Sequence, residues 1–434
     1  MERIVTSVGR SVAVLVGSLV TVPLDLVPVL AALARPRTAP GSPAAQRRTV
    51  VINGGKMTKA LQLARSFHGA GHRVVLVESA KYRYTAHRFS RAVDVFHTVP
   101  EASEPGYARA IADIVLSESA DVFVPVSSPA SSVPDAEVGR LLDGRCDVVH
   151  VDSATVRMLD DKVQFSKVAE SLGLRVPESH LVTDRRQVED FDFPDGRTYI
   201  LKRIAYNPVG RMDLTPLTGR DRAANAAFVS RLDISDEDPW IMQEFVTGQE
   251  YCTHSTVRNG RVQVYGCCES SAFQINYAMV DKPEIRSWVE HFVGELGLTG
   301  QVSFDFIEAA DGHAYAIECN PRTHSAITMF HDHPDVAAAY LDDGHPVITP
   351  LPSARPTYWI YHEIWRLLTQ PGRLARARTI ATGKDAVFTR WDPLPYFMLH
   401  HLHMPSLIWA NLRAGRSWSR IDFNIGKLVE AGGD

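Results

Sequence analysis

The sequence predicts an α/β domain followed by an α+β region. Three observations lead to this class. Apolar strands alternate with an amphipathic helix from residue 49 to residue 151, and two later pairs of strand-like runs are joined by Asn259-Gly260 and Asp311-Gly312, which suit tight hairpin turns. The composition, 45% hydrophobic and 22% charged, is that of ordinary globular proteins, and 434 residues suffice for two or three domains.

The charge and cysteine content exclude several functional classes. A formal net charge of -4 without a long basic stripe gives no reason to expect nucleic-acid binding, so a small-molecule substrate is favoured. Five cysteines are an odd number, Cys267 and Cys268 are adjacent, and no C-x-x-C spacing occurs. A disulfide framework and a zinc site are therefore not expected, and a reducing compartment is.

Residues 1–48 form a hydrophobic N-terminal segment and a linker. Residues 11–34 contain one charge, Asp25, and arginines flank the run on both sides. A secretory signal is one interpretation. A spanning helix is another, although Pro23, Asp25 and Pro28 interrupt it, and an interfacial or re-entrant anchor or a buried helical hairpin fits as well. Residues 35–48, rich in Pro, Ala, Ser and Arg, read as the linker.

Residues 49–150 are predicted to form an α/β domain that opens with TVVINGGKMTKALQLARSFHGAGHRVVLVES, a strand, a Gly-Gly turn, a helix and a second strand. Glycines at a strand end admit an anionic ligand to a helix N-terminus, but they also simply permit a tight connection. The G-x-G-x-x-G pattern of dinucleotide sites is missing. Lys56 is a candidate substrate contact, as is Arg88 in YRYTAHRFSRAV, unless Arg88 belongs to a solvated face.

From residue 151 onward two lysines stand out. Asp160 or Asp161 is expected to cap a helix that begins at about Lys162, where a solvated lysine is the ordinary alternative. Lys202 lies in the apolar strand RTYILKRI and needs a charged partner such as a phosphate. The stretch WIMQEFVTGQE that follows offers apolar side chains, including Val246, suited to an adenine ring.

Residues 301–325, QVSFDFIEAADGHAYAIECNPRTHS, are predicted to form a hairpin. If Ala310 faces His313, Asp305 lies opposite Glu318. Alternation then places Asn320 on the face of Glu318, and Tyr315, Ile317 and Cys319 on the other face. Opposed carboxylates repel each other unless a cation lies between them, and hard oxygen ligands suit Mg²⁺. Arg322 would stabilise a transferring phosphoryl group. Two solvated carboxylates on an outer face are the alternative.

The order Lys162, Lys202, MQEFVTGQE, Asp305 and E-C-N-P-R resembles that of ATP-grasp ligases, from about residue 49 to residue 341. The resemblance implies an ATP-grasp fold in two lobes, residues 151–350, after a Rossmann-like pre-ATP-grasp domain. It implies ATP and Mg²⁺ (or Mn²⁺) as cofactors. The loop after Lys202, RIAYNPVGRMDL, has one glycine where many relatives have a glycine-rich flap. The implied ATP contacts are Lys162, Lys202, Gln243, Glu244, Val246 and Glu250, with Asp305, Glu318 and Asn320 on the metal and Arg322 at the phosphorylated intermediate.

Longer stretches, HRFSRAVD, CTHSTVRNG, CCESSAFQINY and ECNPRTHSAITMF, are similar to the ATP-grasp ligases of mycosporine biosynthesis. Those enzymes join glycine to 4-deoxygadusol through a phosphorylated enol and give mycosporine-glycine, ADP and phosphate. Two alternatives stay open. One is an ATP-grasp ligase that joins another carboxylate to an amino acid, and the other is a non-catalytic nucleotide-binding regulator.

Residues 351–434 form an aromatic-rich C-terminal extension that the resemblance does not cover. Three alternatives are open for the extension: it packs on the N-terminal segment, it lies at a membrane surface, or its aromatic residues simply pack in the core. His324, just after the hairpin, is a candidate for the acceptor pocket, with helix packing as the alternative. Nucleotide chemistry argues against export, so the expected location is cytoplasmic, with membrane association and a homodimer left open.

Overall fold

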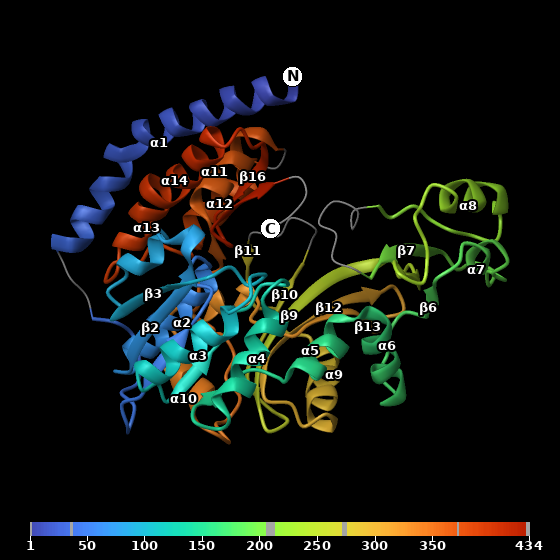
Figure 1. Ribbon diagram of the computed structural model, residues 1–434, viewed down its shortest axis with the longest axis horizontal. Coiled ribbons are helices and arrows are strands. Elements are labelled where there is room, and N and C mark those ends of the chain that lie inside the picture. Colours follow the sequence, from blue (N-terminus) through green and yellow to red (C-terminus); the bar gives the residue numbers. More distant parts are fainter. Residues whose placement is uncertain (1, 35–37, 205–212, 271–275, 371–372, 431–434) are drawn as a thin grey trace.

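A computed structural model describes residues 2–34, 38–204, 213–270, 276–370 and 373–430. The chain runs from a long N-terminal helix, α1 (Glu2–Ala34), through three β-sheet units to a helical C-terminal part that returns to α1. Figure 1 shows α1 lying over the C-terminal helices at one end of the molecule, with α7 and α8 at the other end. The helix α1 and the C-terminal helices therefore share one region.

Residues 49–148 form a five-stranded parallel sheet in the order β3-β2-β1-β4-β5. Its strands are continuous apolar runs, and Val50, Val51 and Ile52 are fully buried, as expected of a sheet covered on both faces. The sheet confirms the predicted α/β organisation, while its Rossmann-like relationship stays a prediction. The elements are β1 (Thr49–Ile52), α2 (Thr58–Gly69), β2 (Arg73–Ser79), β3 (Val95–Val99), α3 (Tyr107–Ser117), β4 (Val122–Val124), α4 (Ser132–Leu142) and β5 (Asp147–Val148), with short 3₁₀ turns Ala80–Tyr82 and Ala86–Phe89.

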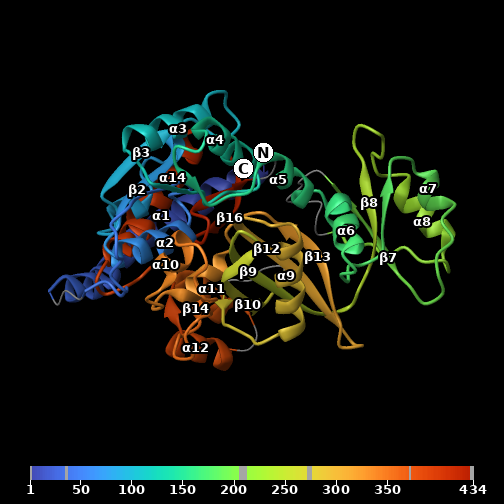
Figure 2. The ribbon, with the colours of Figure 1, turned by 90° about the horizontal axis from the view of Figure 1, so that it is seen from below.

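Two antiparallel sheets follow. The smaller has the order β6-β8-β7, and Figure 2 shows it with α7 and α8 as a lobe set apart from the body. Its elements, with the helices before it, are α5 (Ser153–Asp160), α6 (Lys162–Ser171), β6 (Ser179–Val182), α7 (Arg186–Glu189), β7 (Tyr199–Arg203), α8 (Arg222–Val229) and β8 (Trp240–Glu244). The larger sheet has the order β10-β9-β12-β13, built from β9 (Gly248–Arg258), β10 (Arg261–Glu269), β12 (Gly300–Ala309) and β13 (Ala314–Asn320).

An aromatic core fixes one face of the larger sheet. The helix α9 (Pro283–Glu295) supplies Trp288 and Phe292, and β12 supplies Phe304 and Phe306, all buried in one cluster. The Trp288 and Phe304 rings meet edge to face with centroids 5.2 Å apart. Because side chains alternate along a strand, burial of Phe304 and Phe306 turns Asp305 to the opposite face.

The C-terminal part packs on both the parallel sheet and α1. It contains a short 3₁₀ helix (Ser325–Phe330), α10 (Val336–Leu341), α11 (Ile360–Thr369), α12 (Arg373–Thr382), α13 (Leu394–Met398), a π-helical turn (Leu399–His403), α14 (Met404–Arg413), a small sheet of β11 (Asn276–Tyr277), β14 (Thr357–Tyr358) and β15 (Lys384–Asp385), and the hairpin of β16 (Trp418–Asp422) and β17 (Lys427–Glu430). Its apolar residues join those of the parallel sheet in one hydrophobic core.

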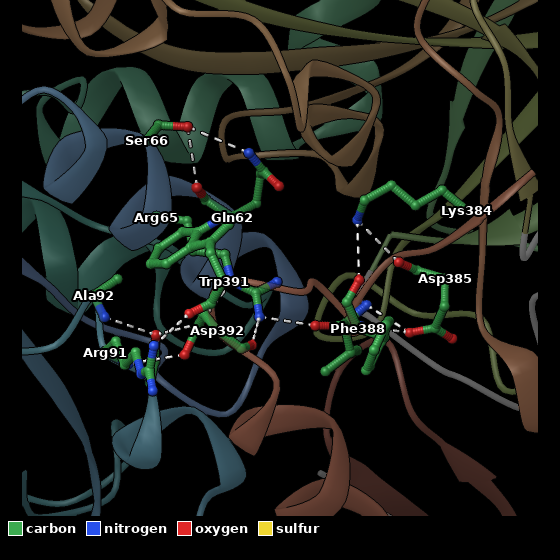
Figure 3. A network of polar contacts seen from close by, with 12 residues as sticks. Gln62, Arg65, Ser66, Arg91, Ala92, Lys384, Asp385, Phe388, Trp391 and Asp392 are labelled. Carbon is green, nitrogen blue, oxygen red and sulfur yellow. Dashed lines mark hydrogen bonds and ion pairs between the residues drawn. The ribbon is translucent and has the colours of Figure 1, made fainter. Parts of the chain in front are cut away.

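A buried ion pair holds the C-terminal part to α2 (Figure 3). The Arg65 Nε lies 2.9 Å from the Asp392 Oδ2, and the two side chains are 6% and 0% exposed. The same carboxylate accepts a hydrogen bond from the Ser90 hydroxyl at 2.6 Å and one from the Arg91 N–H at 2.9 Å. The Arg65 and Asp392 charges are therefore paired with each other, and neither is left buried without a partner.

The helix α1 docks through polar residues spaced seven apart. The indole N–H of Trp418 donates to the Ser11 hydroxyl at 3.0 Å, and the Ser18 hydroxyl donates to the His400 carbonyl at 2.8 Å. Asp25 receives three contacts, from Tyr361, Tyr396 and His401, at 2.5 to 2.8 Å. Of the alternatives for the extension, packing on the N-terminal segment is thus observed.

The alternative of a helical hairpin in residues 11–34 is wrong, because α1 continues through Pro23 and Pro28. A proline inside a helix removes one backbone hydrogen bond and usually bends the helix rather than ending it when tertiary contacts hold both halves. Val8–Ala34 is long and apolar enough to cross a membrane by length and composition, which is weak evidence taken alone. All five cysteines are buried, and none of them forms a disulfide bond in this structure.

Candidate active site

The hairpin of β12 and β13 places Asp305 directly opposite Glu318, as the sequence predicts. The route to that register differs from the prediction. Ala309, not Ala310, faces His313, since the Ala309 N–H donates to the His313 carbonyl oxygen at 2.9 Å. The turn therefore holds three residues rather than two. A β-bulge beside the Asp305 pair contributes one extra residue in β13 and restores the alignment.

The bulge also changes which side chains of β13 meet the aromatic core. Ala316 and Cys319 are buried there, whereas Tyr315 and Ile317 stay partly exposed. The expectation that Tyr315, Ile317 and Cys319 share the buried face is thus correct for Cys319 alone. An extra residue shifts the alternation of every side chain between the turn and the bulge, which explains the error.

The acidic pair belongs to a connected polar group. The Asn320 amide nitrogen lies 3.4 Å from the Asp305 Oδ2, and the Arg322 guanidinium donates to the Asn320 Oδ1. The other arm of Arg322 donates to the Asp160 Oδ1 at 2.9 Å. The side chains that the sequence assigns to metal and phosphoryl binding therefore touch one another, and Asp160 fixes the orientation of the guanidinium.

Two lysines reach this group from neighbouring elements. Lys162 is the first residue of α6, which Asp161 caps by accepting the N–H groups of the two residues after Lys162 at 2.9 Å. Its ammonium lies 3.6 Å from the Glu318 carboxylate. Lys202, on β7, donates to the Gln243 Oε1 of β8 at 3.0 Å. The group is therefore assembled from the smaller sheet, the larger sheet and the start of α6.

The electrostatics of the group are those of a site that is short of positive charge. Burial, followed by the carboxylates of Glu318 and Glu250, raises the pKa of Asp305 to about 7. Burial lowers the pKa of Lys202. The negative charges of Glu318, Glu250 and Asp305 act in the opposite direction and raise it. Asp305 is thus held where ionisation is costly, and a bound cation would remove that cost.

The oxygen ligands fit a hard divalent ion. Asp305 and Glu318 supply carboxylates on one face and Asn320 supplies a carboxamide, a set that suits Mg²⁺ with its remaining positions left to water and phosphate. Among the described residues, no three His, Cys, Asp or Glu side chains are grouped to hold a metal ion. A metal at this place would therefore depend on the amide and on a bound phosphate as well as on the two acids.

The stretch that the resemblance assigns to adenine lies at the end of β8. The N–H groups of Glu244, Phe245 and Val246 donate to backbone carbonyls of Glu178, Thr198 and Glu244, respectively. Adenine recognition by this stretch would accordingly use carbonyl oxygens or exchange these bonds. Glu250, one of the expected ATP contacts, is exposed on β9 and is close enough to Asp305 to raise its pKa.

The three candidate substrate residues lie in different places. The Lys56 ammonium lies 3.9 Å from the Glu78 carboxylate and lines a cavity of about 260 Å³ beside the carboxyl ends of β1, β2 and β4. Arg88 is exposed and donates to the Arg83 carbonyl at 2.7 Å, and no contact among the described residues joins it to Asp305. His324 lies two residues after Arg322 and is half-buried, and its ring meets that of Tyr277 edge to face with the ring centroids 5.6 Å apart.

Lys59 is a site neighbour whose burial next to Arg322 the sequence does not predict. Its ammonium is buried and donates to the Ser127 carbonyl at 3.2 Å and to the Thr323 carbonyl at 2.6 Å. Burial and the charge of Arg322 lower the pKa of Lys59 to about 7. Lys59 therefore ties α2 to the backbone that follows Arg322. Only these contacts reveal the role of Lys59.

Part of the expected site lies outside the described residues. This applies to most of the loop after Lys202, residues 205–212, and to residues 271–275 of the stretch CCESSAFQINY.

Comparison with protein-family models gives no match, and comparison with curated proteins gives no significant match. Solved structures do match. N5-carboxyaminoimidazole synthetase from Staphylococcus aureus gives a TM-score of 0.52 at 14% identity over 74% of this chain and 83% of its own. The same enzyme complexed with ADP gives a TM-score of 0.51 at 15% identity over 73% of this chain and 82% of its own. The biotin carboxylase-β-γ-ATP complex from Campylobacter jejuni gives a TM-score of 0.52 at 15% identity over 68% of this chain and 72% of its own. These neighbours are ATP-grasp proteins. The chain has the ATP-grasp fold.

Proposed function

We propose that the protein is an ATP-dependent carbon–nitrogen ligase that uses Mg²⁺. The observation that carries this proposal is the convergence of Asp305, Glu318 and Asn320 with Arg322 and Lys162 on one face of the β12–β13 hairpin. A shared fold alone does not establish chemistry. Nucleotide complexes of two proteins with this fold, one with ADP and one with β-γ-ATP, add support.

In this proposal Asp305, Glu318 and Asn320 hold the metal, which supplies positive charge to the phosphate oxygens. Lys162 and Lys202 lie beside the acids and neutralise phosphates, with Gln243 holding Lys202 by its 3.0 Å hydrogen bond. The adenosine part of ATP is assigned to residues Gln243, Glu244 and Val246 and to Glu250. Catalysis by such a site rests on positioning and on electrostatic stabilisation rather than on a covalent enzyme intermediate.

Arg322 is proposed to stabilise the phosphorylated intermediate. Its guanidinium is fixed between the Asp160 carboxylate and the Asn320 amide oxygen, and it lies two residues beyond the metal ligand. A planar donor held on two sides presents its remaining N–H groups in a set direction, which favours an oxyanion over water. Burial raises the pKa of Asp160 although Arg322 lowers it. The pairing with Arg322 therefore favours the ionised carboxylate that the guanidinium needs.

For the substrates we propose 4-deoxygadusol and glycine, on the long stretches similar to ligases of mycosporine biosynthesis. The enol oxygen of the cyclohexenone attacks the γ-phosphorus and ADP departs. The glycine amine then adds to the carbon that bears the phosphate, loses a proton, and phosphate leaves, giving mycosporine-glycine. The second candidate is a ligase for another carboxylate, since one neighbour is a carboxyaminoimidazole synthetase and the same group would serve an acyl phosphate.

The test is ADP release by the purified protein with ATP, Mg²⁺ and 4-deoxygadusol, with and without glycine, with the product followed by mass and ultraviolet absorbance. Glycine-dependent ADP release with a condensed product supports the full proposal. Release with a different acid and amine would overturn the substrate and keep the ligase. Nucleotide binding without turnover on any pair would overturn the ligase in favour of a regulator.

A further inference from the structure

The helix α1 has two faces of opposite character. One face is docked on the C-terminal part through Ser11, Ser18 and Asp25. The other is open and apolar: between residues 12 and 34 every exposed side chain is aliphatic, glycine or proline. Its large members are 43% to 72% exposed, and they are Val8, Val12, Val16, Leu19, Val20, Leu24, Val27 and Leu30. Soluble surfaces rarely carry an apolar stripe of this length, so it marks an interaction site.

The neighbouring helices extend the apolar surface. Trp409 of α14, a helix packed on α1, is 55% exposed. On α11, Trp365 and Leu368 are 66% exposed each and share the helix face of Tyr361, whose hydroxyl contacts Asp25 of α1. Exposed tryptophans beside an aliphatic stripe are typical of a protein surface that meets the boundary between lipid headgroups and acyl chains.

The charge distribution complements that surface. Residues 1–48 and 351–434 together contain 17 Lys and Arg against 8 Asp and Glu, whereas residues 49–350 contain 29 against 42. Three of the eight acids, Asp25, Glu363 and Asp392, are buried. Arg10 stacks at 3.8 Å on the Trp418 ring of β16. Arg413, the last residue of α14, and Arg416, between α14 and β16, are both exposed. The part of the molecule that carries the stripe is thus basic in an otherwise acidic protein.

We propose that this face of α1 binds an anionic lipid surface, with the helix lying in the plane of the membrane. Apolar side chains enter the headgroup boundary while the arginines meet lipid phosphates. A spanning position would strip Ser11, Ser18 and Asp25 of their partners and place the Asp25 carboxylate in hydrocarbon, which is costly. A second copy is less suited as the occupant, because two surfaces with the same positive charge would face each other.

The experiment is co-sedimentation of the full chain with vesicles of phosphatidylcholine alone and with added phosphatidylglycerol. We expect binding that is stronger to the anionic vesicles. Leu19→Glu with Leu24→Glu should weaken it at least tenfold, because both leucines are more than 70% exposed and neither supports the fold. Arg413→Gln with Arg416→Gln should weaken binding roughly tenfold on anionic vesicles only.

A matched control places the same substitutions elsewhere. Leu116→Glu with Leu181→Glu changes two exposed leucines, 37% and 46% exposed, on α3 and β6. This variant should bind vesicles like the parent chain, and all variants should keep the parent melting temperature. The proposal is overturned if the parent chain does not sediment, if the Leu19 and Leu24 variant binds equally well, or if that variant instead converts a soluble dimer to a monomer while vesicles bind neither form.

Discussion

Replacing Asp305 by Asn is expected to stabilise the fold at alkaline pH while it abolishes turnover. In the native state burial and the facing Glu318 raise the Asp305 pKa to about 7, whereas an unfolded Asp titrates near 3.9. Between these two values the folded chain binds more protons than the unfolded chain, so stability falls as the pH rises from about 4 to about 7. Above about pH 7 the loss is complete.

The size of the effect follows from the shift. Three pH units at 1.36 kcal/mol each correspond to about 4 kcal/mol. Solvent screens part of this, since Asp305 is only half-buried and the Glu318 side chain is 37% exposed, so we expect about 2 kcal/mol. Asn has nearly the shape of Asp, and the hydrogen bond at stake is the 3.4 Å contact from the Asn320 amide nitrogen.

Thermal unfolding without nucleotide or divalent ions measures this, at about pH 5 and about pH 8. Asp305→Asn should melt several degrees above the parent chain at the higher pH and much closer to it at the lower. Asp311→Asn at the hairpin turn is the control, because the His313 N–H lowers the pKa of Asp311 and its replacement should bring no gain. An Asp305→Asn variant that melts at or below the parent temperature at about pH 8 would refute the reasoning.

Four further outcomes are expected. Glu318→Ala should abolish ADP release without unfolding the chain, and retained turnover would contradict the metal assignment. Lys202→Met should weaken nucleotide binding at least tenfold in a titration with ADP and Mg²⁺, because its ammonium is assigned to phosphate. Asp392→Ala should lower the free energy of unfolding in urea by about 3–5 kcal/mol by leaving the buried Arg65 guanidinium unpaired. Asp161→Ala should cost about 1 kcal/mol through the lost helix cap, whereas an unchanged midpoint would show that the cap is redundant.

Features with local causes were predictable from the sequence. The cap of α6 at Asp161 and the turn at Asn259-Gly260 both appear, and the latter two residues have φ values of 50° and 73°, the left-handed values that such a turn requires. Neither depends on distant packing. The pairing of Asp305 with Glu318 was predicted correctly only because two unpredicted features, the three-residue turn and the β-bulge, offset each other.

Features with distant causes were not predictable. The three-residue turn and the compensating bulge are set by which side chains of β13 fit the aromatic core around Phe304, and no local pattern records that choice. The continuity of α1 through two prolines depends on partners more than 330 residues away. The burial of Lys59 likewise depends on carbonyls contributed by Ser127 and Thr323.

The docking of α1 on the end of the chain has a consequence for biosynthesis. Residue 25 and its partner Tyr361 are separated by 336 residues, and translation at 5–20 residues per second needs about 20 to 70 s to cover that distance. Throughout that time the nascent helix is apolar on one side and lacks hydrogen-bond partners for Ser18 and Asp25 on the other. A chaperone or a lipid surface near the ribosome would shield it. Cells that lack such a chaperone or lipid surface should accumulate the protein in aggregates, because the apolar helices of unfinished chains would associate with one another.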